Sequence, residues 1–168
     1  AVARNQRFPA QWSPMAHEIA TASDQGISAV RSHDREHFDD AVAQLEKNGD
    51  AARLMHSHMV RELLETSYQD GLSGDDVSDV LTRVVGSASR WDAPVDPDAV
   101  AAVLLGALGV GERSGVNGAA AQSIPLVEII SAAILAAADL AADAEVDHEP
   151  YIVRAVDEIR RDQTIEIP

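Results

Sequence analysis

PLVEIISAAILAAADLAAD, residues 125–143, is the stretch that decides the fold. On a helical wheel its apolar residues cover almost the whole circumference, and only Glu128, Asp139 and Asp143 gather within about 60° of each other. A helix that is apolar on nearly every side belongs in the middle of a bundle or across an interface between subunits. The stretch therefore predicts a central helix over about residues 125–144, with neighbours on several sides.

Helix start and stop signals divide the rest of the chain into segments of similar length. The signals are Ser13-Pro14, Asn48-Gly49, Ser73 with Asp76 at capping-box spacing, and Asp96-Pro97. They predict about seven helices, which begin near residues 13, 33, 50, 73, 96, 125 and 150. Because no convincing pair of strands is found, we expect an all-α, single-domain bundle. Residues 1–12 are expected to form an N-terminal arm, 13–162 the helical domain and 163–168 an extended tail.

Charge and composition exclude several classes of function. The formal net charge of −15 would repel phosphate backbones and anionic membranes, so we expect no binding to nucleic acid or membrane. The chain has no cysteine, which removes disulfides and zinc-thiolate sites and is compatible with a cytoplasmic location. The longest markedly apolar stretch, near residues 129–138, is shorter than the roughly 20 residues of a membrane span.

One group of candidate metal ligands lies near the start of the second predicted helix. His33, His37 and Asp40 are spaced i, i+4 and i+7, as in a helical site for a divalent cation. On the wheel these residues lie opposite the apolar positions of the same segment. We therefore interpret them as an exposed face, with a metal or interface site as the alternative.

Acidic residues of the third and fourth predicted helices form a second candidate site. Glu62 and Glu65 make an ExxE pattern with His58 one turn earlier, and Asp76 and Asp79 make a DxxD pattern after a short turn. If the two helices pack antiparallel, four carboxylates converge, and oxygen ligands of this kind suit Mg²⁺.

This spacing resembles that of the all-α nucleotide pyrophosphohydrolases of the MazG-like type, whose pattern is ExxE followed by ExxD on neighbouring helices. The resemblance implies that the four acids hold Mg²⁺ and activate a water against a nucleotide phosphate. Intrahelical pairing is the alternative, because Arg61 lies four residues before Glu65 and Arg83 four residues after Asp79.

Two further polar features have structural interpretations. His56 falls on the apolar side of its helix, which favours a hydrogen-bonded core histidine over a metal ligand. The stripe of Glu128, Asp139 and Asp143 is expected to be a solvated seam, with arginines of the last helix as partners: Arg154, Arg160 and Arg161.

No complete catalytic constellation and no cofactor motif is found, so the leading interpretation is a non-catalytic, acidic helical protein of regulatory or protein-interaction type. We expect a homodimer through the central helix or the Gly/Ala-rich end of the fifth helix, with a further protein partner as an option. One alternative is the Mg²⁺-dependent hydrolase. Another is a small-molecule-binding domain whose pocket mouth lies between the fifth and sixth predicted helices.

Overall fold

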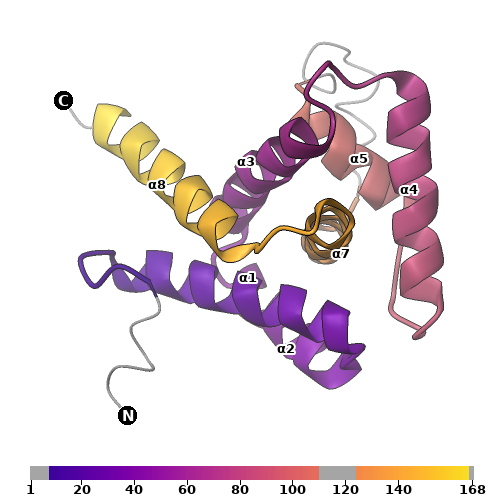
Figure 1. Ribbon diagram of the computed structural model, residues 1–168. Helices are drawn as coiled ribbons and strands as arrows, with labels where there is room; N and C mark the ends of the chain where they lie inside the picture. Colours follow the sequence, from indigo (N-terminus) through magenta and orange to yellow (C-terminus); the bar gives the residue numbers. More distant parts are fainter. Residues whose placement is uncertain (1–7, 110–123, 167–168) are drawn as a thin grey trace.

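The computed structural model describes residues 8–109 and 124–166, and these residues form seven α-helices and no strand (Figure 1). The helices are α1 (Pro14–Ser32), α2 (Arg35–Glu46), α3 (Gly49–Ser67), α4 (Gly74–Ser89), α5 (Pro97–Ala107), α7 (Leu126–Ala144) and α8 (Glu149–Glu166). The prediction of an all-α domain of about seven helices is confirmed, and most of the predicted helix starts lie within two residues of the observed ones.

Ser13, Ser73 and Asp96 cap their helices as predicted, whereas the Asn48 side chain makes no cap hydrogen bond. Ser13 accepts a hydrogen bond from the amide of Ala16, and Pro14 occupies the first turn of α1. Ser73 and Asp76 form both hydrogen bonds of a capping box at the start of α4. These side chains satisfy amide groups that have no partner inside the helix, which fixes where each helix begins.

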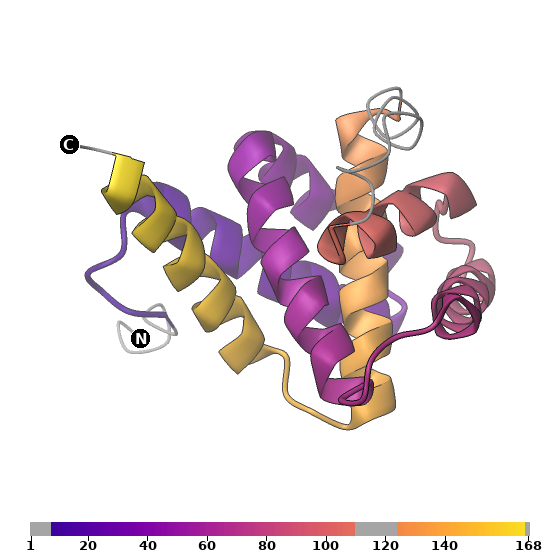
Figure 2. The same ribbon diagram turned by 90° about the horizontal axis from the view of Figure 1, so that it is seen from above.

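Helix α7 runs through the middle of the bundle, as its sequence predicts. Figure 1 looks down its axis, and α1, α2, α3, α4 and α5 all pack against it. Figure 2 shows the same helix lengthwise between these neighbours. Because five helices of its own chain cover α7, its apolar circumference is buried without a second subunit.

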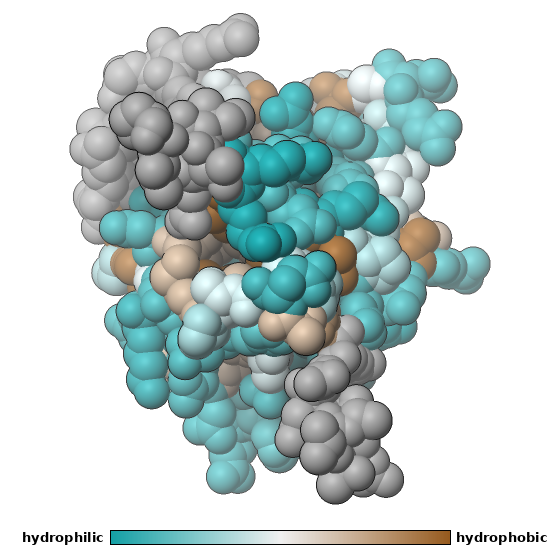
Figure 3. Space-filling model, turned by 90° about the vertical axis from the view of Figure 1, so that its left-hand side faces the viewer, coloured by the Kyte–Doolittle hydropathy of each residue, from teal (hydrophilic) through white to brown (hydrophobic). Residues whose placement is uncertain are grey.

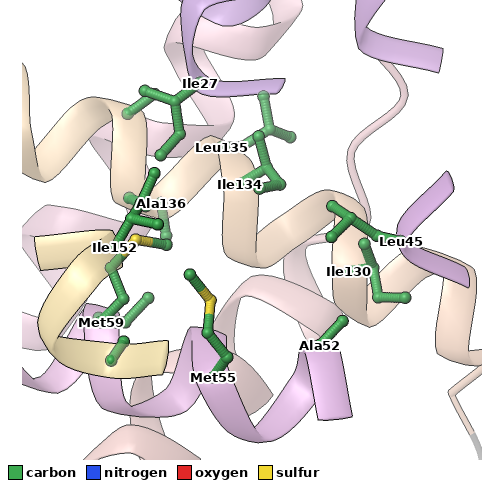
Figure 4. Close-up of a cluster of buried hydrophobic side chains, with 14 of the residues drawn as sticks. Ile27, Leu45, Ala52, Met55, Met59, Ile130, Ile134, Leu135, Ala136 and Ile152 are labelled. Atoms are coloured by element: carbon green, nitrogen blue, oxygen red, sulfur yellow. The ribbon is translucent and has the colours of Figure 1, made fainter. Parts of the chain in front are cut away.

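The core forms where α7 meets α3 and α1 (Figure 4). Ile130 and Ile134 of α7 are fully buried, as are Met55 and Met59 of α3 and Ile27 of α1. The aromatic content is only 4%, so aliphatic side chains and methionines fill most of this volume. Methionine suits such gaps because its side chain is flexible and unbranched.

Part of the predicted N-terminal arm is docked on the bundle. Phe8 and Trp12 are buried and stack with ring centroids 5.8 Å apart, and the Trp12 indole N–H donates to Asp157 of α8. Residues 1–7 lie outside the described part of the chain.

Helix α8 continues to Glu166, so residues 163–166 are helical and the expected extended tail is wrong for them. In a continued helix the backbone amides find acceptors four residues back, whereas a lone extended segment has no strand to pair with.

The second predicted helix begins two residues later than expected. His33 has φ 56° and ends α1 in the left-handed conformation, and Asp34 then caps α2. Glycine or asparagine usually occupies that left-handed position, so the sequence lacks the common signal for this break.

Candidate functional site

A small cavity lies between α3, α5 and α7. Its volume is about 60 Å³, and it is lined from α3 by Arg53, His56 and Ser57, from α5 by Ala102, Val103, Gly106 and Ala107, and from α7 by Ile129, Ile130 and Ala133. A cavity of about 150 Å³ holds benzene, so the enclosed part of a ligand here would be smaller than that. The space is large enough for a few non-hydrogen atoms.

His56 is the buried polar residue of this cavity. The side chain is 1% exposed, and its Nε2 lies 2.9 Å from the hydroxyl oxygen of Ser23 on α1. The other ring nitrogen, Nδ1, is buried and has no hydrogen-bond partner within the described residues. Buried polar atoms are nearly always hydrogen-bonded, so an orphaned ring nitrogen at a cavity calls for an explanation.

Burial lowers the pKa of His56 to about 4. The imidazole is therefore neutral at pH 7, with one nitrogen that donates and one that accepts. If the Ser23 hydroxyl donates to Nε2, Nδ1 carries the proton and is free to donate; in the opposite tautomer Nδ1 accepts. Either way His56 has one unused hydrogen-bonding position and carries no charge.

The cavity has one polar wall and two apolar walls. Arg53, His56 and Ser57 stand at i, i+3 and i+4 on α3, which places them on the same face of that helix. Helices α5 and α7 contribute alanine, valine, isoleucine and glycine. No hydrogen bond or ion pair of Arg53 occurs within the described residues, and its side chain is exposed. The cavity is thus amphipathic, with a cation at its polar side.

The space exists because small side chains face each other across it. Ala102 and Gly106 of α5 and Ala133 of α7 extend little beyond the backbone. A Cβ added at Gly106 would find no atom of the described residues within 4 Å. A pocket mouth is expected from the Gly/Ala-rich region between the fifth and sixth predicted helices, and Gly106 and Ala107, at the start of that region, line this cavity. The segment that follows, residues 110–123, lies outside the described residues.

Ser23 and His56 do not make a catalytic triad. Ser23 is fully buried, and no carboxylate orients Nδ1 of His56 within the described residues. The prediction of a hydrogen-bonded core histidine at position 56 is confirmed. The arrangement is suited to binding through one hydrogen bond and apolar contact rather than to nucleophilic chemistry.

The acidic residues of α3 and α4 do not come together in one site. Helix α4 packs against α5 and α7, not lengthwise against α3 as the metal prediction requires. Glu62 accepts a hydrogen bond from Arg154, and Glu65 accepts one from Arg61 as the pairing alternative predicts. Asp76 is occupied as the N-terminal cap partner of Ser73.

Asp79 does not pair with Arg83 as expected, because Arg83 binds Asp139 instead. His58 lies 3.9 Å from Asp162 of α8 and is separated from the α4 acids. Across residues 8–109 and 124–162, no three His, Asp or Glu side chains are placed to hold one metal ion.

The three residues near the start of α2 are all exposed, as the leading interpretation predicts, and only His33 lies outside that helix. His33 ends α1 and stacks on Trp91 with ring centroids 5.6 Å apart. His37 bonds through Nδ1 to Asp34, and the resulting ion pair raises the pKa of His37. Asp40 is exposed on α2. The expected i, i+4, i+7 register fails because the chain reverses at His33 before α2 begins.

The acidic stripe of α7 has a partner on a different helix from the one expected. Arg83 of α4 donates to Asp139 over 2.7 Å and lies 3.7 Å from Asp143, whereas the arginines of α8 pair elsewhere. Burial raises the pKa of Asp139, and the hydrogen bond from Arg83 opposes that shift. Through Arg83, Asp139 and Asp143 anchor α4 to α7.

One buried polar pair was missed by sequence reasoning. His148, just before α8, lies 2.7 Å through Nε2 from a carboxylate oxygen of Asp24 on α1, and both residues are about 6% exposed. Asp24 lies within a helix whose buried face is otherwise apolar or small, and that is the only signal the sequence offers. The pair joins the first and last helices of the bundle.

None of the helices in the described part of the chain is long and apolar enough to cross a membrane.

Comparisons with known proteins do not supply a function. The chain matches no protein-family model, no curated protein and no solved structure.

Proposed function

We propose that this protein is a non-catalytic helical domain that binds a small molecule in the cavity between α3, α5 and α7. The observation that carries the proposal is His56, a residue that lines the cavity and whose buried Nδ1 has no hydrogen-bond partner within the described residues. Leaving a buried polar group unsatisfied costs about 1–3 kcal/mol, and a ligand atom at Nδ1 would remove that cost. Apolar walls around one convergent polar group are typical of small-molecule sites.

The geometry favours this function over protein interaction through helix packing. The positive sequence feature behind that interpretation is the apolar circumference of α7, and α7 is covered by its own chain. The face of the molecule in Figure 3 is mostly hydrophilic, with hydrophobic residues in separate small patches. The homodimer stays a prediction, and light scattering of the eluting peak in size-exclusion chromatography would test it.

A cavity-filling variant tests the proposed function. Ala133→Leu places a larger side chain in the cavity, and Ala142→Leu makes the same change on an exposed position of α7. Short alkyl molecules with one polar group, such as 1-butanol, should shift amide NMR signals of cavity residues in the parent chain and in Ala142→Leu. We expect Ala133→Leu to lose these shifts. Equal binding by all three proteins, or shifts confined to other surfaces, would contradict the proposal.

A further inference from the structure

The polar wall of the cavity narrows the chemical class of the ligand. Among the residues that the structure describes, Arg53 is the one cationic residue that lines the cavity, and it has no ion pair there. The guanidinium of Arg53 is therefore available to bind an anion at the cavity. Arginine holds carboxylates well because its planar guanidinium presents several donors in a fixed geometry.

The three polar side chains of the cavity all come from neighbouring positions of α3. Ser57 lies one turn beyond Arg53, and His56 is its chain neighbour, so the three side chains share one face of α3 and line the same cavity. The opposite walls offer only apolar contact, from residues such as Val103 and Ile129. A ligand that satisfies both sides has one anionic end and a short hydrocarbon end.

Volume sets the length of that hydrocarbon end. About 60 Å³ is less than half of the roughly 150 Å³ that encloses benzene, which leaves room for about two to four carbon atoms. Larger anions such as nucleotides do not fit this space, and their hydrophilic groups would face apolar walls.

We propose that the cavity binds a short-chain monocarboxylate, whose carboxylate lies against Arg53, Ser57 and His56 and whose alkyl chain lies between α5 and α7. This inference rests on the proposed function. The carboxylate is only an acceptor, so Nδ1 of His56 carries the proton and donates to it. Nε2 then accepts from the Ser23 hydroxyl over the 2.9 Å already seen between them. The bound ligand therefore selects one tautomer of His56.

The test compares probes that share a chain and differ at the head group: sodium butyrate, 1-butanol and n-butylammonium chloride. Each is titrated into the parent protein, Arg53→Gln and Arg61→Gln, and followed by amide NMR shifts. Arg61 is the matched control because it lies on the same helix, is exposed and pairs with Glu65. We expect butyrate to bind at least about tenfold more tightly than the other two, a ratio equivalent to about 1.4 kcal/mol.

Arg53→Gln should remove that preference and leave butanol binding within about twofold, which fits the loss of a single charge-assisted contact. Arg61→Gln should bind all three probes as the parent does. The ring ¹⁵N shifts of His56 should move toward the Nδ1–H tautomer when butyrate is added.

Two contrary results are distinguishable. If butanol binds as tightly as butyrate and Arg53→Gln changes neither, the carboxylate inference is overturned while small-molecule binding at the cavity stands. If no probe shifts the signals of cavity residues, or if Ala133→Leu binds all probes like the parent, the proposed function itself is overturned.

Discussion

The two flanks of α7 are both built from small residues, but they pack differently. On the side of α1 and α2, Gly26 lets the backbone of α1 approach so closely that an added Cβ would lie 3.1 Å from Ile134 and 3.4 Å from Ala41. On the side of α3 and α5, Ala133 and Gly106 face a cavity. Close packing therefore depends on a large side chain that fills the space left by a small one. No large side chain of the described residues does this at the cavity between α3, α5 and α7.

The largest expected effect comes from adding the same side chain to each flank. Gly26→Leu should destabilise the protein by about 3 kcal/mol, because fully buried Ile134 has no room to move. Ala133→Leu enters the cavity and should cost less than about 1 kcal/mol. Urea unfolding of both variants measures the difference. Equal losses would mean that the two flanks are packed alike.

Acid should destabilise the folded protein because it protonates His56 more readily in the unfolded chain than on the cavity flank. Its pKa is about 4 in the folded protein against about 6.5 when unfolded, so the unfolded chain binds more protons between these values. The free energy of unfolding should therefore fall by about 3 kcal/mol from this group as the pH drops from 6.5 to 4. The full contribution is present above pH 6.5.

His56→Gln should remove that part of the pH dependence, which appears as the difference between the variant and the parent in urea titrations. The control is His37→Gln on the exposed side of α2, where the raised pKa gives the opposite sign. If His56→Gln loses stability toward pH 4 as steeply as the parent does, His56 is not buried as a neutral group.

Replacing glycine with alanine should change the free energy of unfolding by less, and should stabilise the protein on one flank only. Gly106→Ala should raise the free energy of unfolding by up to about 1 kcal/mol, since the added Cβ meets no atom in the described part of the chain and helix propensity improves. Gly26→Ala gains the same propensity but crowds Ile134, so we expect no net stabilisation. Thermal unfolding of the two single variants separates these outcomes. A larger gain at position 26 would show that α1 and α7 can separate at little cost.

The smallest effect is expected outside both flanks, from Mg²⁺. The acids at positions 62, 65 and 76 each have a hydrogen-bond partner in the chain. Millimolar Mg²⁺ should therefore shift the melting temperature by less than about 1 °C, as linkage predicts for a cation without a folded-state site. A rise of several degrees that Glu62→Gln abolishes would restore the hydrolase interpretation.

Local signals in the sequence were enough for the helices but not for the way they meet. Serine and aspartate mark helix starts because their side chains accept hydrogen bonds from backbone amides, and proline does so because its fixed φ angle suits the first turn. The central position of α7 follows from its composition alone. The predictions that failed concern contacts between residues far apart in the sequence and one unusual backbone conformation. Arg83 lies at the right spacing for Asp79 but binds Asp139 on another helix, and His33 adopts a left-handed conformation that its residue type rarely signals.

The candidate site was partly predictable for the same reason. Glycine and alanine near the end of α5 indicate space, and His56 falls on the apolar side of its helix. That the two features meet, and that Nδ1 is left without a partner within the described residues, depends on how α3, α5 and α7 cross. No local pattern contains that information.

The position of α7 in the chain has a consequence for synthesis on the ribosome. The helix at the centre of the bundle is the last but one of the described helices to be made, and five of its neighbours precede it. At about 5–20 residues per second, roughly 2 to 7 seconds separate the addition of Ala107 from that of Ala144. During that interval the apolar faces of the earlier helices have no central partner, which makes the nascent chain a client for chaperones just before the fold closes.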